Sequence, residues 1–115
     1  MQIDSYRFGR IVIDGEEFAD DVILVADRVV SPWWREAGGH LFATVDLRPV
    51  FEAKPGVVVL GLGRWGRVRI ADGLHHDLAA AGIEVVAEPT PGAVATFNRL
   101  DAGGASVAAA LHLTC

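Results

Sequence analysis

The sequence is poor in cysteine and in long apolar runs, and each shortage excludes a class of protein. A single cysteine, Cys115, excludes an intramolecular disulfide and any metal site built from several cysteines. The continuous apolar runs are far shorter than the roughly 20 residues that a membrane-spanning helix requires. We therefore expect a chain that has no disulfide and does not insert into a membrane.

Basic residues are scarce relative to acidic ones, with 10 lysines and arginines against 15 aspartates and glutamates and a net charge of −5. Non-specific nucleic-acid binding comes mainly from cations that neutralise phosphates, so this balance predicts no nucleic-acid partner. Residues 64–69 depart from it, because they contain three arginines and no acidic residue. The first residues have neither the basic start nor the apolar stretch of a secretory signal, which predicts a cytoplasmic protein.

Metal-binding and catalytic patterns are missing too. His75 and His76 are adjacent, so on a helix their side chains diverge by about 100° and cannot share a metal. His112 and Cys115 together supply too few ligands for a tetrahedral zinc site. The one nucleophilic interpretation makes Cys115 a thiolate with His112 or His40 as its base, and it requires a fixed cationic neighbour. We therefore expect no cofactor, no metal and no catalytic residues, and the sequence favours a protein that is not an enzyme.

What the sequence does contain is a hydrophobic fraction of 51% in 115 residues, enough for one domain spanning residues 1–115. Its first half is typical of β structure, with a turn signal at Asp14-Gly15 and a stop at Pro32. The expected strands are residues 3–8, 10–13, 22–25 and 29–30. The first of these predict an N-terminal β-hairpin or small sheet, and the apolar run at 22–25 is expected in a sheet covered on both faces.

Strands and helices alternate in the second half. Asp46, Asp72 and Thr90 are expected to cap three helices at their N-termini, and Gly82 and Gly103 to end the second and third helix. The strands between and after these helices are residues 57–60, 83–87 and 107–113. We therefore expect an α/β fold of three layers, with a mixed, mostly parallel central sheet, flanking helices and the extra N-terminal sheet.

Gly61, Gly63 and Gly66 form a G-x-G-x-x-G motif directly after an apolar strand. In dinucleotide-binding folds such glycines let the backbone approach a pyrophosphate, which rests on the N-terminus of the following helix. Here residues 67–70 alternate between polar and apolar and predict a strand, so no helix begins at the third glycine. We interpret the motif as a glycine-rich loop at the end of a strand rather than as a dinucleotide site.

Two candidate ligand or interaction sites remain. The glycine-rich loop leaves an anion site open through Arg64, Arg67 and Arg69, with Trp65 as a lid. Trp34, Arg35 and the downstream His40 form the second candidate, because exposed tryptophan and arginine are typical anchors of protein interfaces. Trp33 and Trp34 are adjacent, and we expect at least one of the two to be buried in the core.

Several short patterns spread over the whole chain resemble a known family. They are Asp4-Ser5-Tyr6, Phe8-Gly9, Ile11, Ile13, Gly15, Trp34-Arg35, Gly39-His40, Gly61-Leu62-Gly63, Thr90, Ala93-Val94, Phe97-Asn98-x-Leu100 and, most specifically, residues 107–115. The chain resembles a widespread domain of unknown function found as small single-domain bacterial and archaeal proteins. The eukaryotic relatives of that domain include mitochondrial NADH dehydrogenase (complex I) assembly factor 3 and the adipogenesis-associated domain protein.

The resemblance implies a three-layer α/β domain with a mixed central sheet and no established activity, cofactor or catalytic residue. Leu62 stands where threonine is common in the family, and Phe97 replaces the usual tyrosine, so two polar groups that could bind a ligand are absent. We expect a non-catalytic interaction or assembly domain with an unknown protein partner, as a monomer or small homo-oligomer. The alternative is a small-molecule or anion (nucleotide or phosphate) binding protein, or an enzyme, that uses residues 61–69.

Overall fold

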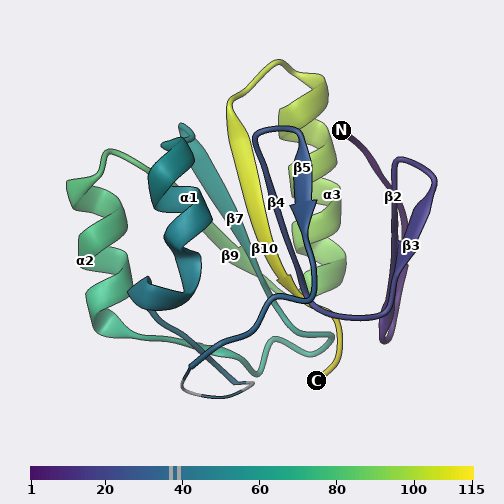
Figure 1. The fold of residues 1–115 in the computed structure, drawn as a ribbon, viewed down its shortest axis with the longest axis horizontal. Coiled ribbons are helices and arrows are strands. Elements are labelled where there is room, and N and C mark those ends of the chain that lie inside the picture. Colours follow the sequence, from purple (N-terminus) through teal and green to yellow (C-terminus); the bar gives the residue numbers. More distant parts are fainter. Residues whose placement is uncertain (37, 39) are drawn as a thin grey trace.

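Short strands precede alternating helices and strands in the described residues, which are 1–36, 38 and 40–115 of this computed structural model (Figure 1). The structure adds two short strands, Glu16–Phe18 and Leu41–Phe42, that the sequence did not predict. In chain order the elements are β1 (Ile3–Arg7), β2 (Arg10–Ile13), β3 (Glu16–Phe18), β4 (Val22–Val25), β5 (Arg28–Val30), β6 (Leu41–Phe42), the 3-10 helix η1 (Thr44–Leu47), α1 (Arg48–Ala53), β7 (Val57–Leu62), β8 (Arg69–Ile70), α2 (Asp72–Ala80), β9 (Glu84–Glu88), α3 (Thr90–Ala102) and β10 (Val107–His112).

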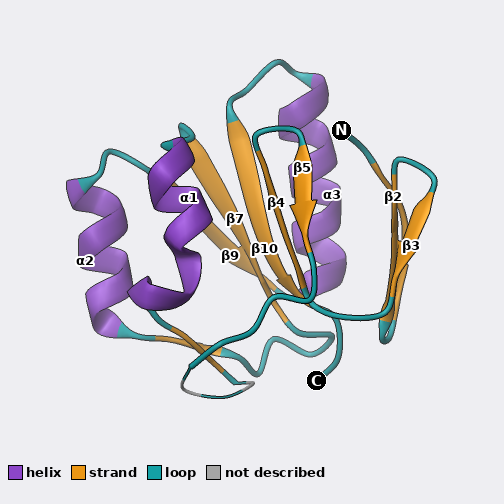
Figure 2. Ribbon diagram, in the orientation of Figure 1, coloured by secondary structure: helices purple, strands orange, loops and turns teal. Residues whose placement is uncertain are grey.

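The central sheet has the strand order β5-β4-β10-β7-β9 (Figure 2). β10 and β9 both run parallel to β7, whereas β4 is antiparallel to β10 and β5 is antiparallel to β4. The prediction of an α/β domain with a mixed central sheet is therefore confirmed. The expectation of a mostly parallel sheet applies to only half of it, because β4 and β5 form a hairpin, and a tight hairpin connection permits only antiparallel pairing.

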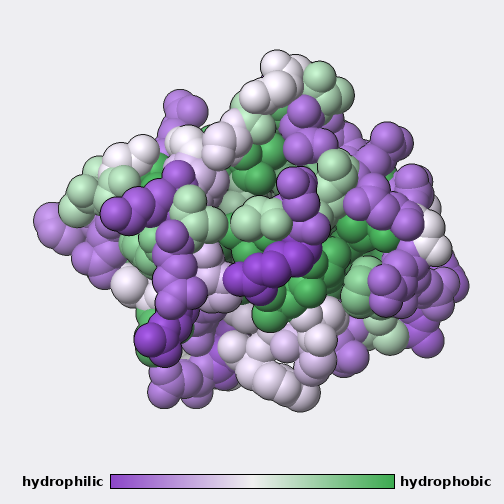
Figure 3. Space-filling view, turned by 45° about the horizontal axis from the view of Figure 1, so that its top comes forward, coloured by the Kyte–Doolittle hydropathy of each residue, from purple (hydrophilic) through white to green (hydrophobic). Residues whose placement is uncertain are grey.

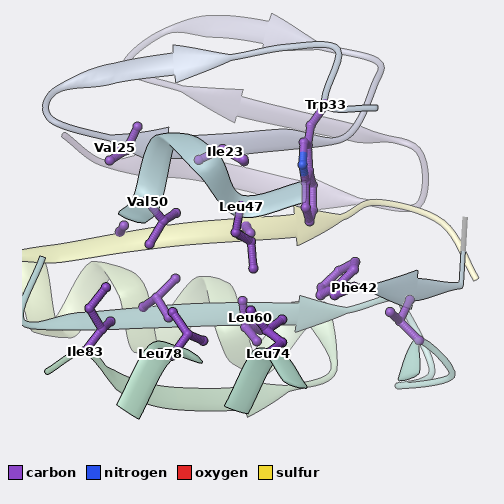
Figure 4. Close-up of a cluster of buried hydrophobic side chains, with 14 residues drawn as sticks. Ile23, Val25, Trp33, Phe42, Leu47, Val50, Leu60, Leu74, Leu78 and Ile83 are labelled. Carbon is purple, nitrogen blue, oxygen red and sulfur yellow. The ribbon is translucent and has the colours of Figure 1, made fainter. Parts of the chain in front are cut away.

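One face of the central sheet packs against helices α1 and α2. Alternate residues of β10, Ala108 and Ala110, point to this face, where Leu74 and Leu78 of α2 belong to the same buried cluster. Figure 4 shows this cluster, with the α2 side chains approaching the sheet from one side. Alternate residues of β10 face the helices, and here they are alanines. Because alanine is small, the helices can pack close to this face of the sheet.

The opposite face of the central sheet packs against helix α3 and the N-terminal sheet. Ala109 and Leu111, the intervening residues of β10, point to this side, together with Phe97 of α3 and Ile11 of β2. Both faces of β10 are thus covered, as the continuous apolar character of these strands predicts.

The N-terminal sheet, with the order β1-β2-β3, confirms the predicted extra β element. Asp14 and Gly15 have φ angles of +48° and +83°, and they connect β2 to β3 as a two-residue hairpin turn of the kind that requires left-handed residues. β3 was missed because Glu16 and Glu17 are exposed and its sequence has no apolar alternation.

None of the three expected helix caps, Asp46, Asp72 and Thr90, is the cap residue in the structure. Asp46 lies inside η1, and its carboxylate accepts hydrogen bonds from the N–H groups of Ala43 and Glu36 at 3.0 and 2.9 Å. Asp72 is the first residue of α2 rather than its cap. Asp46 therefore fastens the preceding loop instead of starting α1.

The outer strands of the central sheet are β5 and β9. β5 is only three residues long, and β9 begins and ends with a glutamate. Short length and charge are features by which sheets avoid pairing edge to edge.

Figure 3 shows hydrophobic residues in the middle of one face of the molecule, bordered by hydrophilic ones. None of the helices in the described ranges is long and apolar enough to cross a membrane.

The packing of α3 against the central sheet can be tested with Phe97→Ala. Phe97 is 2% exposed and fills the space between α3 and the sheet, so we expect its truncation to lower the free energy of unfolding by about 3–5 kcal/mol. Val45→Ala is the control, because Val45 is 60% exposed and its truncation should change the value by less than about 0.5 kcal/mol. Urea denaturation of both variants measures the difference, and equal effects would contradict this packing.

Candidate functional site

The carboxyl ends of β7, β9 and β10 lie together at one end of the central sheet, at the bottom of Figure 1. In open α/β sheets this is the end at which ligands usually bind. A cavity of about 380 Å³ opens beside the end of β10. Its lining comes from three segments, namely residues 19–21, residues 32–35 with Gly38, and residues 112–114.

A buried charged network lines this cavity. Asp21 Oδ2 accepts a hydrogen bond from an Arg35 Nη2 group at 2.8 Å and lies 2.7 Å from His112 Nδ1. The other carboxylate oxygen, Oδ1, accepts the N–H of Leu113 at 2.8 Å. The three side chains are almost enclosed, with exposed fractions of 15% for Asp21, 5% for Arg35 and 8% for His112. Removing one side chain of such a network would leave a buried charge without its partner. The three side chains therefore depend on one another.

The contacts of His112 assign its tautomer. Nδ1 lies 2.7 Å from Asp21 and 3.2 Å from Arg35. A guanidinium only donates and a carboxylate only accepts, so Nδ1 cannot serve both partners. The shorter contact assigns the hydrogen to Nδ1, donated to Asp21. The lone pair of the neutral ring is then on Nε2, which lies 3.3 Å from the Thr114 hydroxyl oxygen, a distance at which the hydroxyl donates to it.

Arg35 is held in the core beside two aromatic rings. Its guanidinium carbon lies 4.7 Å from the ring centroid of Trp33 and 5.3 Å from that of Phe42, whose mutual arrangement is visible in Figure 4. Cation–π attraction of this kind strengthens when the groups are desolvated. The expectation that Arg35 is an exposed anchor beside Trp34 is therefore wrong, because Asp21 and the two rings draw the guanidinium inward. Trp34 itself is 80% exposed, and the burial of one tryptophan is confirmed by Trp33 at 5%.

Asp21 has a lowered pKa. Burial alone raises the pKa of this carboxyl, but hydrogen bonds from His112, the Leu113 N–H and Arg35 outweigh burial and lower the pKa below its ordinary value. Asp21 is therefore ionised over the whole neutral range and neutralises the guanidinium beside it.

The glycines of the G-x-G-x-x-G motif are explained by packing within the protein. A Cβ atom on Gly61 would lie 2.7 Å from Leu111 Cδ2 and 3.0 Å from Thr90 Oγ1. Gly63 has a φ of +92°, and a Cβ atom there would lie 2.9 Å from the main-chain oxygen of Thr114. The end of β7 thus runs so close to β10 and the residues after it that side chains are excluded.

The backbone N–H groups of this loop are used inside the protein. Gly63 donates to Thr90 Oγ1 at 3.0 Å, Arg64 to the Thr114 carbonyl at 2.9 Å, and Gly66 to the Gly63 carbonyl at 3.1 Å. Among the described residues after the third glycine, the next regular element is strand β8, which confirms that no helix begins there. The amides of Gly63, Arg64 and Gly66 are therefore not available to a pyrophosphate, and the helix dipole that would hold it is missing after the third glycine.

Helix α3 begins beside the glycine loop, but its N-terminus is already occupied. The expected capping role of Thr90 is wrong: the cap residue is Pro89, and the Thr90 hydroxyl donates instead to the His112 carbonyl at 2.6 Å. The carboxylate of Glu88 lies over the first turn, where a Cβ atom on Gly92 would come within 2.9 Å of it. A negative charge of the protein itself therefore fills the position that an anionic ligand would take.

An aromatic cluster lies on the outside of the loop. Trp65 is 60% exposed, and its ring centroid is 5.6 Å from that of Phe8, which is 50% exposed at the tip of the β1–β2 hairpin. Residues 113–115 run between this cluster and the cavity. They are held by the Tyr6 hydroxyl, which donates to the Leu113 carbonyl at 2.8 Å, and by His40 Nε2, 2.7 Å from the Cys115 main-chain oxygen.

The two sequence-predicted sites therefore lie on opposite sides of residues 113–115. Trp34 and Arg35 line the cavity, whereas the glycine-rich loop with Arg64 and Trp65 packs on the other side and is not among the lining residues described. Sequence reasoning missed Asp21 and Phe8. The signal for Asp21 was an acidic residue directly before a continuous apolar strand, where a buried partner is needed.

The close approach at Gly61 can be tested with Gly61→Ala. The added methyl group must displace Leu111, so we expect a loss of about 1–3 kcal/mol in the free energy of unfolding. Gly73→Ala is the matched control, because a Cβ atom there meets nothing within 4 Å and alanine is the better helix former in α2. Thermal denaturation compares the two, and a neutral Gly61→Ala would remove the packing explanation of the motif.

The lowered pKa of Asp21 predicts an acid-sensitive contribution to stability. A depressed folded-state pKa stabilises the fold above the unfolded value of about 4, and this contribution is lost as the pH falls through the folded pKa. Asp21→Asn should therefore cost about 3–5 kcal/mol at neutral pH, and the difference from the unsubstituted protein should shrink below pH about 4. Denaturant titrations at several pH values measure this difference, and a pH-independent gap would contradict the ionised network.

Comparisons with solved structures and family models place the chain. It matches a conserved hypothetical protein from Pyrococcus horikoshii at 24% identity and a TM-score of 0.86, covering 100% of both chains. A Bordetella pertussis protein described as a Mth938-like domain matches at 23% identity and a TM-score of 0.72, covering 97% of this chain and 85% of that one. A Bartonella henselae protein described as an outer membrane protein matches at 24% identity and a TM-score of 0.84, covering 98% and 94%.

These likenesses show the fold alone. No protein with a curated description matches the chain. The family model for proteins of unknown function DUF498/DUF598 matches residues 3–112. The chain therefore belongs to the DUF498/DUF598 family of proteins of unknown function.

Proposed function

We propose that this domain is a non-catalytic protein-interaction module that holds an acidic segment of a partner protein against the carboxyl ends of its central strands. The interacting surface, here called the carboxyl-end surface, consists of Phe8, Trp34, Arg64 and Trp65 on the two sides of residues 113–115. The exposure of its aromatic side chains is the observation that carries the proposal.

Large aromatic side chains are exposed at this end of the molecule although the core elsewhere is well filled. Trp34 is 80%, Trp65 60% and Phe8 50% exposed, whereas Trp33 and Phe42 are 5% and 0% exposed. Tryptophan and arginine are enriched among the residues that dominate binding energy at protein interfaces. An exposed aromatic surface costs solubility unless it serves an interaction.

Charge identifies the chemistry of the partner. Arg64, Arg67 and Arg69 are exposed in the glycine loop and the segment after it, without an acidic residue between them, although the whole chain carries a net charge of −5. Such a local basic surface attracts acidic segments and accelerates their encounter. The partner segment that fits is therefore acidic, with apolar side chains to cover the tryptophans.

An assembly-type role agrees with this surface and with the sequence resemblance to mitochondrial complex I assembly factor 3. Binding an unassembled protein segment requires an exposed, rigid surface and no reacting group. The cytoplasmic location, the absence of nucleic-acid binding and the monomeric or small homo-oligomeric state stay predictions from the sequence.

The alternative is a small-molecule or anion binding protein, and the cavity of about 380 Å³ is the observation in its favour. Pockets of a few hundred Å³ commonly hold small ligands. An anion is the less suitable occupant, because Asp21 neutralises Arg35 in the cavity and the loop amides of Gly63 and Arg64 donate within the protein.

The interaction is tested with a panel of short fluorescent peptides that combine glutamates with leucine or tryptophan at different spacings. We expect saturable binding by at least one acidic peptide and a loss of about 10-fold or more in affinity, or about 1.4 kcal/mol, for Arg64→Glu and for Trp65→Ala. Arg28→Glu is the matched charge control, because Arg28 is exposed at the opposite end of β4. Fluorescence anisotropy at two salt concentrations measures the affinities.

Three outcomes would contradict the proposal: no acidic peptide binds, the surface variants bind as well as Arg28→Glu, or a single-stranded oligonucleotide competes more strongly than any peptide. A thermal-shift screen of nucleotides, phosphates and carboxylates addresses the alternative. A ligand at 100 times its dissociation constant stabilises the fold by about 2.7 kcal/mol, which such a screen detects.

A further inference from the structure

We propose that Thr114, His112 and Asp21 form a nucleophilic site, in which the Thr114 hydroxyl accepts an acyl group from an activated ester bound in the cavity. This site would add a chemical activity to the interaction module proposed above; it shares Trp34 with the carboxyl-end surface but does not depend on peptide binding there. It is the one place in the described part of the chain where a hydroxyl, an imidazole and a carboxylate follow one another within hydrogen-bond reach and open into a cavity.

The order of contacts is that of a nucleophile, its base and an orienting acid. The Thr114 hydroxyl oxygen lies 3.3 Å from His112 Nε2, and His112 Nδ1 lies 2.7 Å from Asp21 Oδ2. Nucleophile-to-base distances in unliganded sites are often longer than in the reacting complex. Such a constellation is recognised by its geometry and roles rather than by its order in the sequence.

The carboxylate fixes the imidazole in the form that can take a proton. Asp21 accepts the hydrogen on Nδ1 and leaves the lone pair on Nε2, directed toward Thr114. Asp21 is itself held by Arg35 and by the Leu113 N–H, so the ring has little freedom to turn. The imidazolium that forms when His112 takes a proton is stabilised by the same ionised carboxylate.

Both residues of the proposed nucleophile–base pair border space that a ligand can enter. Both Thr114 and His112 line the cavity of about 380 Å³, and the exposed indole of Trp34 forms part of its wall. An acyl chain or aromatic ester can pack against that indole. The volume suits a small carboxylic ester rather than a polymer.

Transfer of the acyl group to Thr114 needs neither a metal nor a redox partner. The Thr114 oxygen attacks the acyl carbon and forms a C–O bond, while its proton passes to His112 Nε2. The bond from the acyl carbon to the leaving alcohol then breaks, and the leaving oxygen takes the proton from His112. Water attacking the resulting threonine ester, with the same histidine as base, returns the free hydroxyl and a carboxylic acid.

The experiment uses p-nitrophenyl acetate and a Cys115→Ala background, which removes the neighbouring thiol as a competing nucleophile. The structural contact of Cys115 is made by its main-chain oxygen, which lies 2.7 Å from His40 Nε2 and which the alanine keeps. Peptide mapping by mass spectrometry locates the acetyl group, and the rate of its attachment is followed with time. We expect acetylation at Thr114, none at this position in Thr114→Val, retained or faster acetylation in Thr114→Ser, and a loss of about 100-fold in His112→Gln.

Thermal denaturation verifies that each variant is folded. If His112→Gln unfolds, the comparison of Thr114→Val with Thr114→Ser still decides, because threonine and valine have nearly the same shape. Acetyl groups found only on the N-terminal amine and Lys54 would overturn the proposal. So would acetylation of Thr114 at the rate of an unfolded peptide, or an unchanged rate in a folded His112→Gln variant. None of these results would bear on peptide binding at the carboxyl-end surface.

Discussion

Asp21 joins segments that are far apart in the chain, and the arrangement of the whole carboxyl end depends on it. Its carboxylate binds the Leu113 N–H, His112 and Arg35, so the start of β4, the end of β10 and the loop after β5 are fixed together. These groups are nearly enclosed, and a buried charge is tolerated only when its partners are in place. The network therefore demands one arrangement of the three segments rather than several.

The network also gives the surface around it a rigid base. Arg35 packs beside the rings of Trp33 and Phe42, which belong to the core, while the preceding residue, Trp34, projects into solvent. On the other side, the Thr114 carbonyl after β10 accepts a hydrogen bond from the Arg64 N–H of the glycine loop that carries Trp65. Exposed aromatic side chains on a rigid base lose little conformational entropy on binding, which favours their use as anchors.

Most of the fold could be predicted from the sequence because its strands and helices obey simple periodicity. The apolar runs of β4 and β7 and the stop at Gly82 are local signals, and the structure contains each of them. The antiparallel addition of β4 and β5 could not be predicted, since the sequence does not state which strand a hairpin joins. Thr90 was misassigned for a similar reason: its hydroxyl serves β7 and β10 rather than its own helix.

The candidate site was only half predictable. The glycine motif was correctly separated from dinucleotide sites by the strand pattern after it, but the cause of its glycines, the closeness of β10, lies in tertiary packing. Arg35 was expected at the surface because nothing near it in the sequence reveals a carboxylate 14 positions away, at Asp21. Long-range ion pairs of this kind leave no local pattern.

The tautomer of His112 tests the account of this end of the molecule most directly. Long-range ¹⁵N–¹H correlation spectra of the uniformly labelled protein distinguish the two ring nitrogens of each histidine. We predict that neutral His112 carries its hydrogen on Nδ1, bound to Asp21, with Nε2 unprotonated toward Thr114. A neutral ring protonated on Nε2 would contradict the network, because Asp21 would then face a nitrogen lone pair instead of a donor.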